Sequence, residues 1–282
     1  MPELPEVETV VRGLREPLIG RTILSMWHDW PNSIHSPNPT EFAARVAGQT
    51  IRAVERRAKY IVVHLPDDVL LIHLKMTGRL YVCPDDTLDH ADQWVHVRFQ
   101  LDNGHQLRFS DSRKFGKVYL TDDLNTITGK LGVEPLSAEF TPQAFAHMLQ
   151  GRTRALKPLL LDQSHVVGVG NIYADEALFR AGLHPLQPAN TLTTAQTVAL
   201  HEAIIHVLQT GIQHNGASVD WYRRADGTKG QMQNHLNIYD RADEPCYTCG
   251  SPIRKIRVAQ RGTHYCPNCQ ALHEGSLDEP NL

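Results

Sequence analysis

A proline at position 2, directly behind the initiator methionine, is the residue of this sequence with the most unusual chemistry. We expect removal of Met1, which would leave Pro2 with a free secondary amine. Such an amine attacks carbonyl-like carbons, and its iminium adduct stays positively charged because it has no N–H proton to lose. A carboxyl group that could move protons follows at Glu3. The same residues also suit the first turn of an ordinary helix, which tolerates proline and favours acids.

Four cysteines near the end of the chain have the spacing of a zinc site. They form two Cys-x2-Cys pairs with sixteen residues between the pairs, and they are Cys246, Cys249, Cys266 and Cys269. Each pair places two thiolates on one tight turn, so that the two turns complete a tetrahedron. Because sulfur fills all four positions, we expect one structural Zn²⁺ without an open catalytic site. Free thiols or two disulfides are the alternatives, and disulfides are rare in cytosolic proteins.

Charge is distributed unevenly along the sequence. The 282 residues have a formal net charge of -3, and the last twelve contain three acids and no cation. Three upstream stretches are locally basic, at 52–59, 152–157 and 246–270. A phosphate backbone attracts such clusters, although each one could equally be solvated surface. No run approaches the roughly eighteen apolar residues of a membrane span, and acids interrupt the place of a signal peptide. We therefore expect a cytoplasmic protein with no membrane partner.

The elements that must position these residues are of two kinds. Apolar residues at helical spacing predict a helix over 5–16. Short apolar runs separated by turn signals fill residues 21–120, including Asp-Asn-Gly at 102–104, and they predict an antiparallel sandwich or barrel. Beyond residue 140 the pattern becomes helical, with helices expected over 141–150, 154–163, 172–181 and 192–214. Cys83, alone on an expected strand, is interpreted as a core residue.

Six motifs occur in an order that resembles the formamidopyrimidine-DNA glycosylase family, bacterial enzymes that remove 8-oxoguanine and ring-opened purines. The motifs are PELPEVET, RRAKY, HLKMTG, DSRKFG, VVGVGNIYADEALFRAGLHP and AQRGTHYC. The resemblance extends from Pro2 to about Gln270. It implies an α+β fold, in which an N-terminal antiparallel β-sandwich with a leading helix precedes a helix–two-turns–helix domain and a β-hairpin zinc finger. It also implies a monomer that binds damaged double-stranded DNA.

The resemblance divides the chain into four parts. They are a catalytic sandwich domain (1–132), a helix–two-turns–helix DNA-binding domain (133–225), a flexible lesion loop with the zinc finger (226–270) and an acidic tail (271–282).

The catalytic roles that the resemblance implies involve five residues. Pro2 would attack the sugar C1′, and Glu3 would be the general acid that opens the ribose ring. Lys59 would contact phosphate and assist proton transfer. Asn171 and Arg261 would hold the phosphates around the lesion, and a Gly-rich turn before a helix can bind phosphate in this way.

A base inside a duplex must be extruded before an enzyme can act on it, and the gap must be filled. The resemblance assigns this role to Met76, Arg113 and Phe115, and the glycines beside them favour loops. A basic stretch adds Arg152 and Lys157 as candidate DNA contacts.

The expected function is a bifunctional DNA glycosylase and AP lyase of base-excision repair that excises oxidised purines and cuts the strand by β,δ-elimination, without an organic cofactor. One alternative is an endonuclease VIII-like glycosylase for oxidised pyrimidines, but Leu4 between Glu3 and Pro5 departs from the opening of that branch. Another is a non-catalytic zinc-finger DNA-binding protein, which would need no free secondary amine. Trp94 lies where relatives often have a DNA-contacting histidine, so that contact is not assigned.

Overall fold

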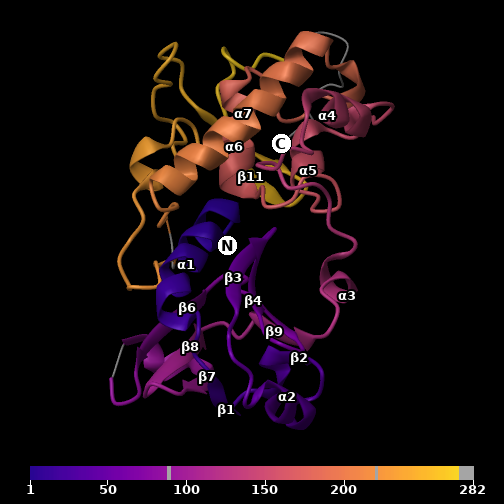
Figure 1. Cartoon of the computed structure of the whole chain (residues 1–282). Coiled ribbons are helices and arrows are strands. Elements are labelled where there is room, and N and C mark those ends of the chain that lie inside the picture. The colour runs from indigo at the N-terminus through magenta and orange to yellow at the C-terminus, as the bar shows by residue number, and fades with distance from the viewer. Residues whose placement is uncertain (88–89, 220–221, 273–282) are drawn as a thin grey trace. The chain divides into compact units, whose positions relative to one another are not determined.

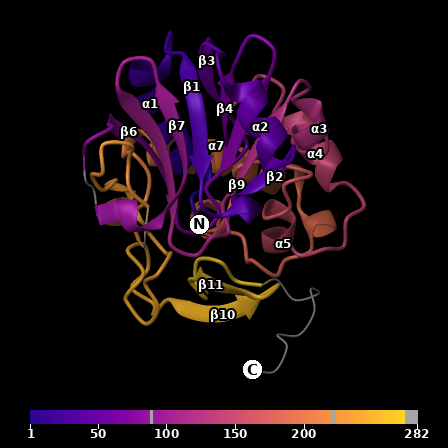
Figure 2. The same cartoon turned by 90° about the horizontal axis from the view of Figure 1, so that it is seen from below.

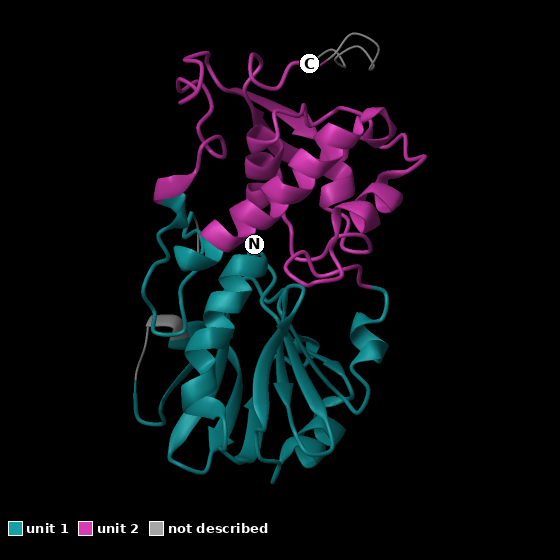
Figure 3. Cartoon of the chain, turned by 45° about the horizontal axis from the view of Figure 1, so that its top comes forward, with its two compact units in different colours: residues 1–130, 211–233 teal, residues 131–210, 234–282 magenta. Residues whose placement is uncertain are grey.

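The structure is a computed structural model that describes residues 1–87, 90–219 and 222–272 (Figure 1). Contacts within the chain divide it into two compact units, coloured separately in Figure 3. Unit 1 comprises residues 1–130 and 211–233, and unit 2 comprises residues 131–210 and 234–282. The domain boundaries expected from the sequence stay a prediction, since compactness and functional domains divide a chain by different criteria. Most of the expected acidic tail, 273–282, lies outside the described residues.

Unit 1 is built on two sheets. The four-stranded sheet has the order β1 (Ile23–His28), β7 (Val95–Leu101), β8 (His105–Asp111) and β6 (Gly78–Pro84). The five-stranded sheet has the order β2 (Ile34–Ser36), β9 (Lys117–Thr121), β5 (Val69–His73), β4 (Tyr60–His64) and β3 (Ala53–Arg57). All neighbouring strands are antiparallel except β2 and β9, which run parallel. The expected Asp-Asn-Gly hairpin joins β7 to β8.

The main apolar core of unit 1 lies between the two sheets. Strand residues alternate across each sheet, so that Ile61 and Val63 of β4 enter this core together with Phe99 of β7. Val62 points the other way and joins a smaller cluster with Leu71. Cys83 is a buried residue of β6, as expected. The predicted sandwich with a leading helix is thereby confirmed.

The leading helix, α1 (Leu4–Leu18), contains the helix predicted over 5–16. Its apolar stripe, which includes Val7, Val11 and Leu14, is fully buried in the core of the sandwich. Burial of each such side chain stabilises the fold by roughly 1.5–3 kcal/mol. Pro5 lies in the first turn, where the missing N–H costs no helical hydrogen bond. Because α1 packs against β3, β4 and β6, the sandwich holds this helix in place.

Shorter elements complete unit 1. They are η1 (Pro31–Ser33), α2 (Pro39–Val46), η2 (His90–Trp94), α3 (Asn125–Thr128) and η4 (Met232–His235), the last of which continues into unit 2.

Unit 2 is helical and ends in a β-hairpin. Its helices are α4 (Pro142–Leu149), α5 (Leu156–Leu160), α6 (Asn171–Arg180), η3 (Ala189–Thr191) and α7 (Thr194–Gln213), whose last residues belong to unit 1. The four predicted helices are present, although α5 is shorter than expected. Strands β10 (Arg254–Val258) and β11 (Arg261–Tyr265) form the hairpin seen in yellow in Figure 2. Among the described residues, no helix is both long and apolar enough to span a membrane.

Candidate active site and DNA-binding surface

The first turn of α1 places Pro2 and Glu3 at a defined position. Both residues are buried, and Glu3 is the residue that precedes the helix. The Glu6 carboxylate accepts a hydrogen bond of 2.8 Å from the backbone N–H of Glu3 through its Oε2 atom. This is one half of a capping box, an arrangement that fixes the direction in which a chain enters a helix. A residue that precedes a helix at a chain terminus is thus kept from fraying.

The same Glu6 carboxylate also binds a distant part of unit 1. Its Oε1 atom accepts a hydrogen bond of 2.7 Å from the backbone N–H of Ala217, which follows α7. Gly216 has a φ of 79°, and a Cβ atom there would lie 2.9 Å from Glu6 Cγ. Only glycine therefore allows the chain to approach Glu6 so closely. Glu6 was not among the site residues predicted from the sequence.

Lys59 lies on the tight turn between β3 and β4, and it is only 5% exposed. Ala58 before it has a φ of 54°, a left-handed conformation that is uncommon outside glycine. Arg56 stabilises this turn by donating to the Ala58 carbonyl at 3.1 Å and by pairing with Glu8 of α1 at 3.2 Å. Arg56 therefore connects the turn that carries Lys59 to α1, the helix that follows Pro2 and Glu3.

His73, the last residue of β5, is a neighbour of Lys59 that the sequence analysis missed. Its Nδ1 atom accepts a hydrogen bond of 3.0 Å from the backbone N–H of Lys75. Burial, together with the charges of Lys75 and Lys59, lowers the pKa of His73 to about 3. The ring is therefore neutral at pH 7 and carries its proton on Nε2. The histidine at the start of the HLKMTG motif was the available signal.

The three expected gap-filling residues lie on two loops of unit 1. Met76 is half-buried on the turn between β5 and β6, whereas Arg113 and Phe115 are exposed on the connection between β8 and β9. The Arg113 guanidinium lies 4.7 Å from the centroid of the Phe115 ring, within range of a cation–π interaction. Phe115 is 49% exposed, which is unusual for a large apolar side chain on a well-packed sandwich. The glycine-based expectation that these residues lie on loops agrees with the structure.

In unit 2, the Gly-rich turn before α6 is organised by one side chain. Gln163 accepts from the Gly168 N–H and donates to the Val169 carbonyl, both at 2.9 Å. Gly170 is the residue that caps α6, so Asn171 is the first residue inside the helix rather than its cap. Asn171 Nδ2 donates to the Gly262 carbonyl at 3.0 Å. The first turn of a helix presents backbone N–H groups at its N-terminal end, and this end favours an anion.

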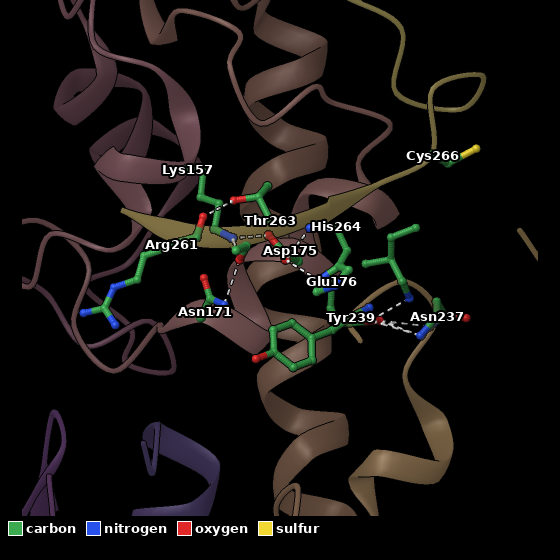
Figure 4. A network of polar contacts seen from close by, with 12 residues as sticks. Lys157, Asn171, Asp175, Glu176, Asn237, Tyr239, Arg261, Thr263, His264 and Cys266 are labelled. Atoms are coloured by element: carbon green, nitrogen blue, oxygen red, sulfur yellow. Dashed lines mark hydrogen bonds and ion pairs between the residues drawn. The ribbon is translucent and has the colours of Figure 1, made fainter. Parts of the chain in front are cut away.

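Lys157 was predicted to contact DNA, but the structure does not support this contact because the Lys157 side chain is 0% exposed. The Nζ atom lies 2.6 Å from Asp175 Oδ1 and donates to the Gly262 carbonyl at 3.1 Å (Figure 4). Asp175 Oδ2 in turn accepts from the backbone N–H of His264 at 2.9 Å. A buried lysine needs a counter-charge, and this one has it within the protein. Lys157 thus holds β11 against α6 and does not face a phosphate.

A second buried carboxylate, Glu176, supports the same region of unit 2. It accepts hydrogen bonds from the backbone N–H groups of Asn237, Ile238 and Tyr239 at 2.8–3.0 Å (Figure 4). The carboxylate thereby fixes the chain that leads into the cysteine module.

Arg261 begins β11 and is exposed, directly beside the Gly262 carbonyl that Asn171 and Lys157 hold. The turn before it contains Ala259 and Gln260, both with positive φ (45° and 64°), as a two-residue type I′ hairpin requires. Further exposed cations of the hairpin are Arg254, Lys255 and Arg257. Arg152 is also exposed, after α4. Exposed cations of this kind attract a phosphate backbone.

The four cysteines of the predicted zinc site come together in unit 2. Their sulfur atoms all lie within 4.8 Å of one another, with Cys249 3.4 Å from Cys266 and Cys246 3.9 Å from Cys269. Tetrahedral Zn–S bonds of about 2.3 Å require sulfurs about 3.8 Å apart, so these side chains fit the ion. Hydrogen bonds from Ser251 and then Asn268 lower the pKa of Cys249 to about 5. The four sulfurs would fill every position of a tetrahedral Zn²⁺, so the ion that fits here is structural rather than catalytic.

Comparison with known proteins agrees with this geometry. The chain matches the formamidopyrimidine-DNA glycosylase N-terminal domain over residues 1–118, the formamidopyrimidine-DNA glycosylase H2TH domain over 131–222 and the zinc finger found in FPG and IleRS over 243–272. The formamidopyrimidine-DNA glycosylase of Chloroflexus aurantiacus is 49% identical, with 96% of this chain and 98% of the relative aligned.

Solved structures of the Lactococcus lactis enzyme are similar over the same length. Its complex with DNA that contains an abasic site has a TM-score of 0.89 and 36% identity, and its complex with Fapy-dG containing DNA has a TM-score of 0.87 and 36% identity. Each comparison covers 96% of this chain and 100% of the other.

The fold and the site together define a zinc-finger protein with an N-terminal β-sandwich, a helix–two-turns–helix region and a proline that follows the initiator methionine. The chain belongs to the formamidopyrimidine-DNA glycosylase family. It is accordingly a DNA glycosylase and AP lyase of base-excision repair.

Proposed function

We propose that this glycosylase excises 8-oxoguanine and formamidopyrimidines from duplex DNA, with Pro2 as the nucleophile, and cuts the strand at the resulting site. The observation that carries the proposal is the position of Pro2 and Glu3. Both are buried directly before α1, and Glu6 binds the backbone N–H of Glu3. The comparison with a relative bound to Fapy-dG containing DNA supports the purine class. The alternative of oxidised pyrimidines is tested by the experiment below.

The chemistry follows from a free amine on Pro2 after removal of Met1. The amine nitrogen forms a bond to the sugar C1′ while the bond from C1′ to the base breaks, and the base leaves with a proton. Glu3 donates a proton to the ring oxygen, so the sugar opens and the nitrogen becomes an iminium. Loss of a C2′ proton then expels the 3′-phosphate, and a second elimination expels the 5′-phosphate. Water finally hydrolyses the iminium and regenerates the amine.

Each unit contains groups that would bind phosphates of the damaged strand. Lys59 supplies a cation beside the neutral donor His73, and the two lie together in unit 1. Arg261 and Asn171 lie together in unit 2, where both border the Gly262 carbonyl. The exposed cations of the hairpin and Arg152 would contribute sequence-independent attraction. The structural zinc would keep the hairpin folded and takes no part in the reaction.

Met76, Arg113 and Phe115 would occupy the space that the extruded nucleotide leaves. An apolar chain and an aromatic ring can replace the stacking of the lost base, and a guanidinium can donate to the base on the other strand. The solvent exposure of Phe115 is consistent with such a partner. We further propose that the four domains have the boundaries given above, and that the enzyme acts as a monomer in the cytoplasm.

Trapping with borohydride tests the proposed nucleophile. The enzyme is incubated with a duplex that has one 8-oxoguanine opposite cytosine, reduced, and digested for mass analysis of the N-terminal peptide. An adduct on Pro2 is the expected result, and it requires that Met1 has been removed. Trapping with an oxidised pyrimidine in place of 8-oxoguanine would transfer the substrate to the alternative class. DNA binding without an adduct on either duplex would contradict the mechanism.

A further inference from the structure

One buried carboxylate, Asp111, binds both loops that carry the expected gap-filling residues. It is the last residue of β8 and is 1% exposed. It lies opposite Gly78, the first residue of β6, in the sheet register. The turn that carries Met76 ends at Gly78, and the loop that carries Arg113 and Phe115 starts at Asp111. The two loops therefore leave the sheet side by side at this residue pair.

The two oxygens of Asp111 are shared between the loops. Oδ1 accepts from the hydroxyl of Thr77, the neighbour of Met76, and from the backbone N–H of Arg113 at 3.2 Å. Oδ2 accepts from the backbone N–H of Gly116 at 2.6 Å, directly behind Phe115. Hydrogen bonds to an ionised carboxylate are stronger than those between neutral groups. A single charge thus fixes both ends of the Arg113–Phe115 segment and the turn of Met76.

The glycines beside the carboxylate leave little freedom for another arrangement. A Cβ atom on Gly116 would lie 2.2 Å from the ring of Phe109, and a Cβ atom on Gly78 would lie 2.4 Å from the Leu74 carbonyl oxygen. The Arg113–Phe115 loop is thus packed against the sheet at Gly116, and the Met76 turn closes tightly on its own backbone at Gly78. The cation–π contact between Arg113 and Phe115 then orients the two side chains relative to each other.

We propose that Asp111 and Thr77 are positioning residues for base extrusion, which hold Met76 at a set distance from Arg113 and Phe115. The inference rests on the proposed function, since it needs these three side chains to enter the duplex. It predicts that loss of the connection slows the extrusion of the lesion and leaves the chemistry of Pro2 intact.

The test compares two substrates under single-turnover conditions. One is a duplex with 8-oxoguanine opposite cytosine, whose base must be extruded. The other is a single-stranded oligonucleotide with a preformed abasic site, which needs the Pro2 chemistry but no extrusion. Asp111→Asn and Thr77→Val are both expected to slow excision from the duplex at least about tenfold, the size that loss of a hydrogen bond to a charged group gives. Cleavage of the single strand should stay within about twofold, and Thr77→Ser, which keeps the hydroxyl, should restore duplex excision.

A double-mutant cycle separates positioning from general stability. In a Met76→Ala background, Thr77→Val should have no further effect on excision, because its role acts through Met76. Additive effects, or parallel losses on both substrates together with a lower unfolding temperature, would overturn the inference. Wild-type excision by Asp111→Asn and Thr77→Val would also overturn it, and would leave the proposed function standing. If Met76→Ala, Arg113→Ala and Phe115→Ala combined excise like the wild type, the proposed gap-filling roles themselves are wrong.

Discussion

The carboxylate of Glu6 accepts a hydrogen bond of 2.7 Å from the backbone N–H of Ala217, although 211 positions of the chain separate the two residues. The other oxygen of the same carboxylate binds the N–H of Glu3. The start of the chain, where the proposed nucleophile lies, is therefore attached to the segment behind α7. Both residues belong to unit 1, so the connection is internal to one compact body.

Replacement of Glu6 by glutamine should weaken this connection. The amide has one acceptor oxygen in place of two, so one of the two backbone N–H groups loses its partner. We expect a loss of about 1–3 kcal/mol in the free energy of unfolding, measured with denaturant, and a slower excision of 8-oxoguanine. Glu16, exposed on the same helix, is the matched control, and Glu16→Gln should change stability by less than about 0.5 kcal/mol. Equal stability of the two variants would contradict the proposed attachment.

Lys157 and Arg152 come from one basic stretch, but the structure predicts opposite behaviour for them. Lys157→Met leaves Asp175 as an unpaired buried charge, and we expect a loss of about 3–5 kcal/mol in the free energy of unfolding. Adding Asp175→Asn removes that charge, retains an acceptor for the His264 N–H, and should recover most of the stability. Arg152→Ala should leave stability unchanged and weaken DNA binding, with a smaller salt dependence. Unfolding curves and binding titrations at several salt concentrations distinguish the two residues.

Buried, neutral His73 predicts a pH dependence of stability. Its pKa is about 3 in the folded protein, against about 6.5 in the unfolded chain. Between these pH values the unfolded chain binds a proton that the folded protein does not bind. The stability that neutral His73 contributes is therefore complete above pH 6.5 and declines as the pH falls toward 3. The slope should approach about 1.4 kcal/mol per pH unit within this window. His73→Asn keeps an acceptor for the Lys75 N–H and should show a shallower slope between pH 6.5 and 4. Identical slopes would indicate that His73 is not neutral in the folded protein.

Removal of zinc should disable DNA binding before it disturbs the sandwich. Cys249→Ser removes one zinc ligand, and a strong chelator removes the metal itself. In small zinc modules the free energy of metal binding is of the order of 10 kcal/mol, and either treatment removes its contribution to folding. We expect one zinc per chain by elemental analysis, loss of that zinc on treatment, and loss of tight binding to duplex DNA. The signals of unit 1 in an NMR spectrum should persist. Tight binding by the zinc-free protein would show that Arg261 and its hairpin are not part of the DNA surface.

Local patterns in the sequence were sufficient for the elements and for the metal site. The helix over 5–16, the Asp-Asn-Gly hairpin and the paired cysteines each depend on residues within a few positions of one another. Helical periodicity and turn geometry are set at that range, and the recurrence of a second Cys-x2-Cys pair indicates the metal site. These predictions were therefore confirmed without knowledge of the fold.

Burial and long-range connection were decided by the tertiary structure alone. Lys157 looked like any cation of a basic stretch, and only the packing of α5, α6 and β11 shows that its charge is compensated inside the protein. Asp111 binds groups on two loops, and Glu6 binds groups in two segments of unit 1 that are far apart in the sequence. Nothing in the sequence distinguishes either residue from other acidic residues. A hydrogen bond across tens or hundreds of positions leaves no periodic trace in one sequence, because its geometry exists only once the sheets and helices have packed.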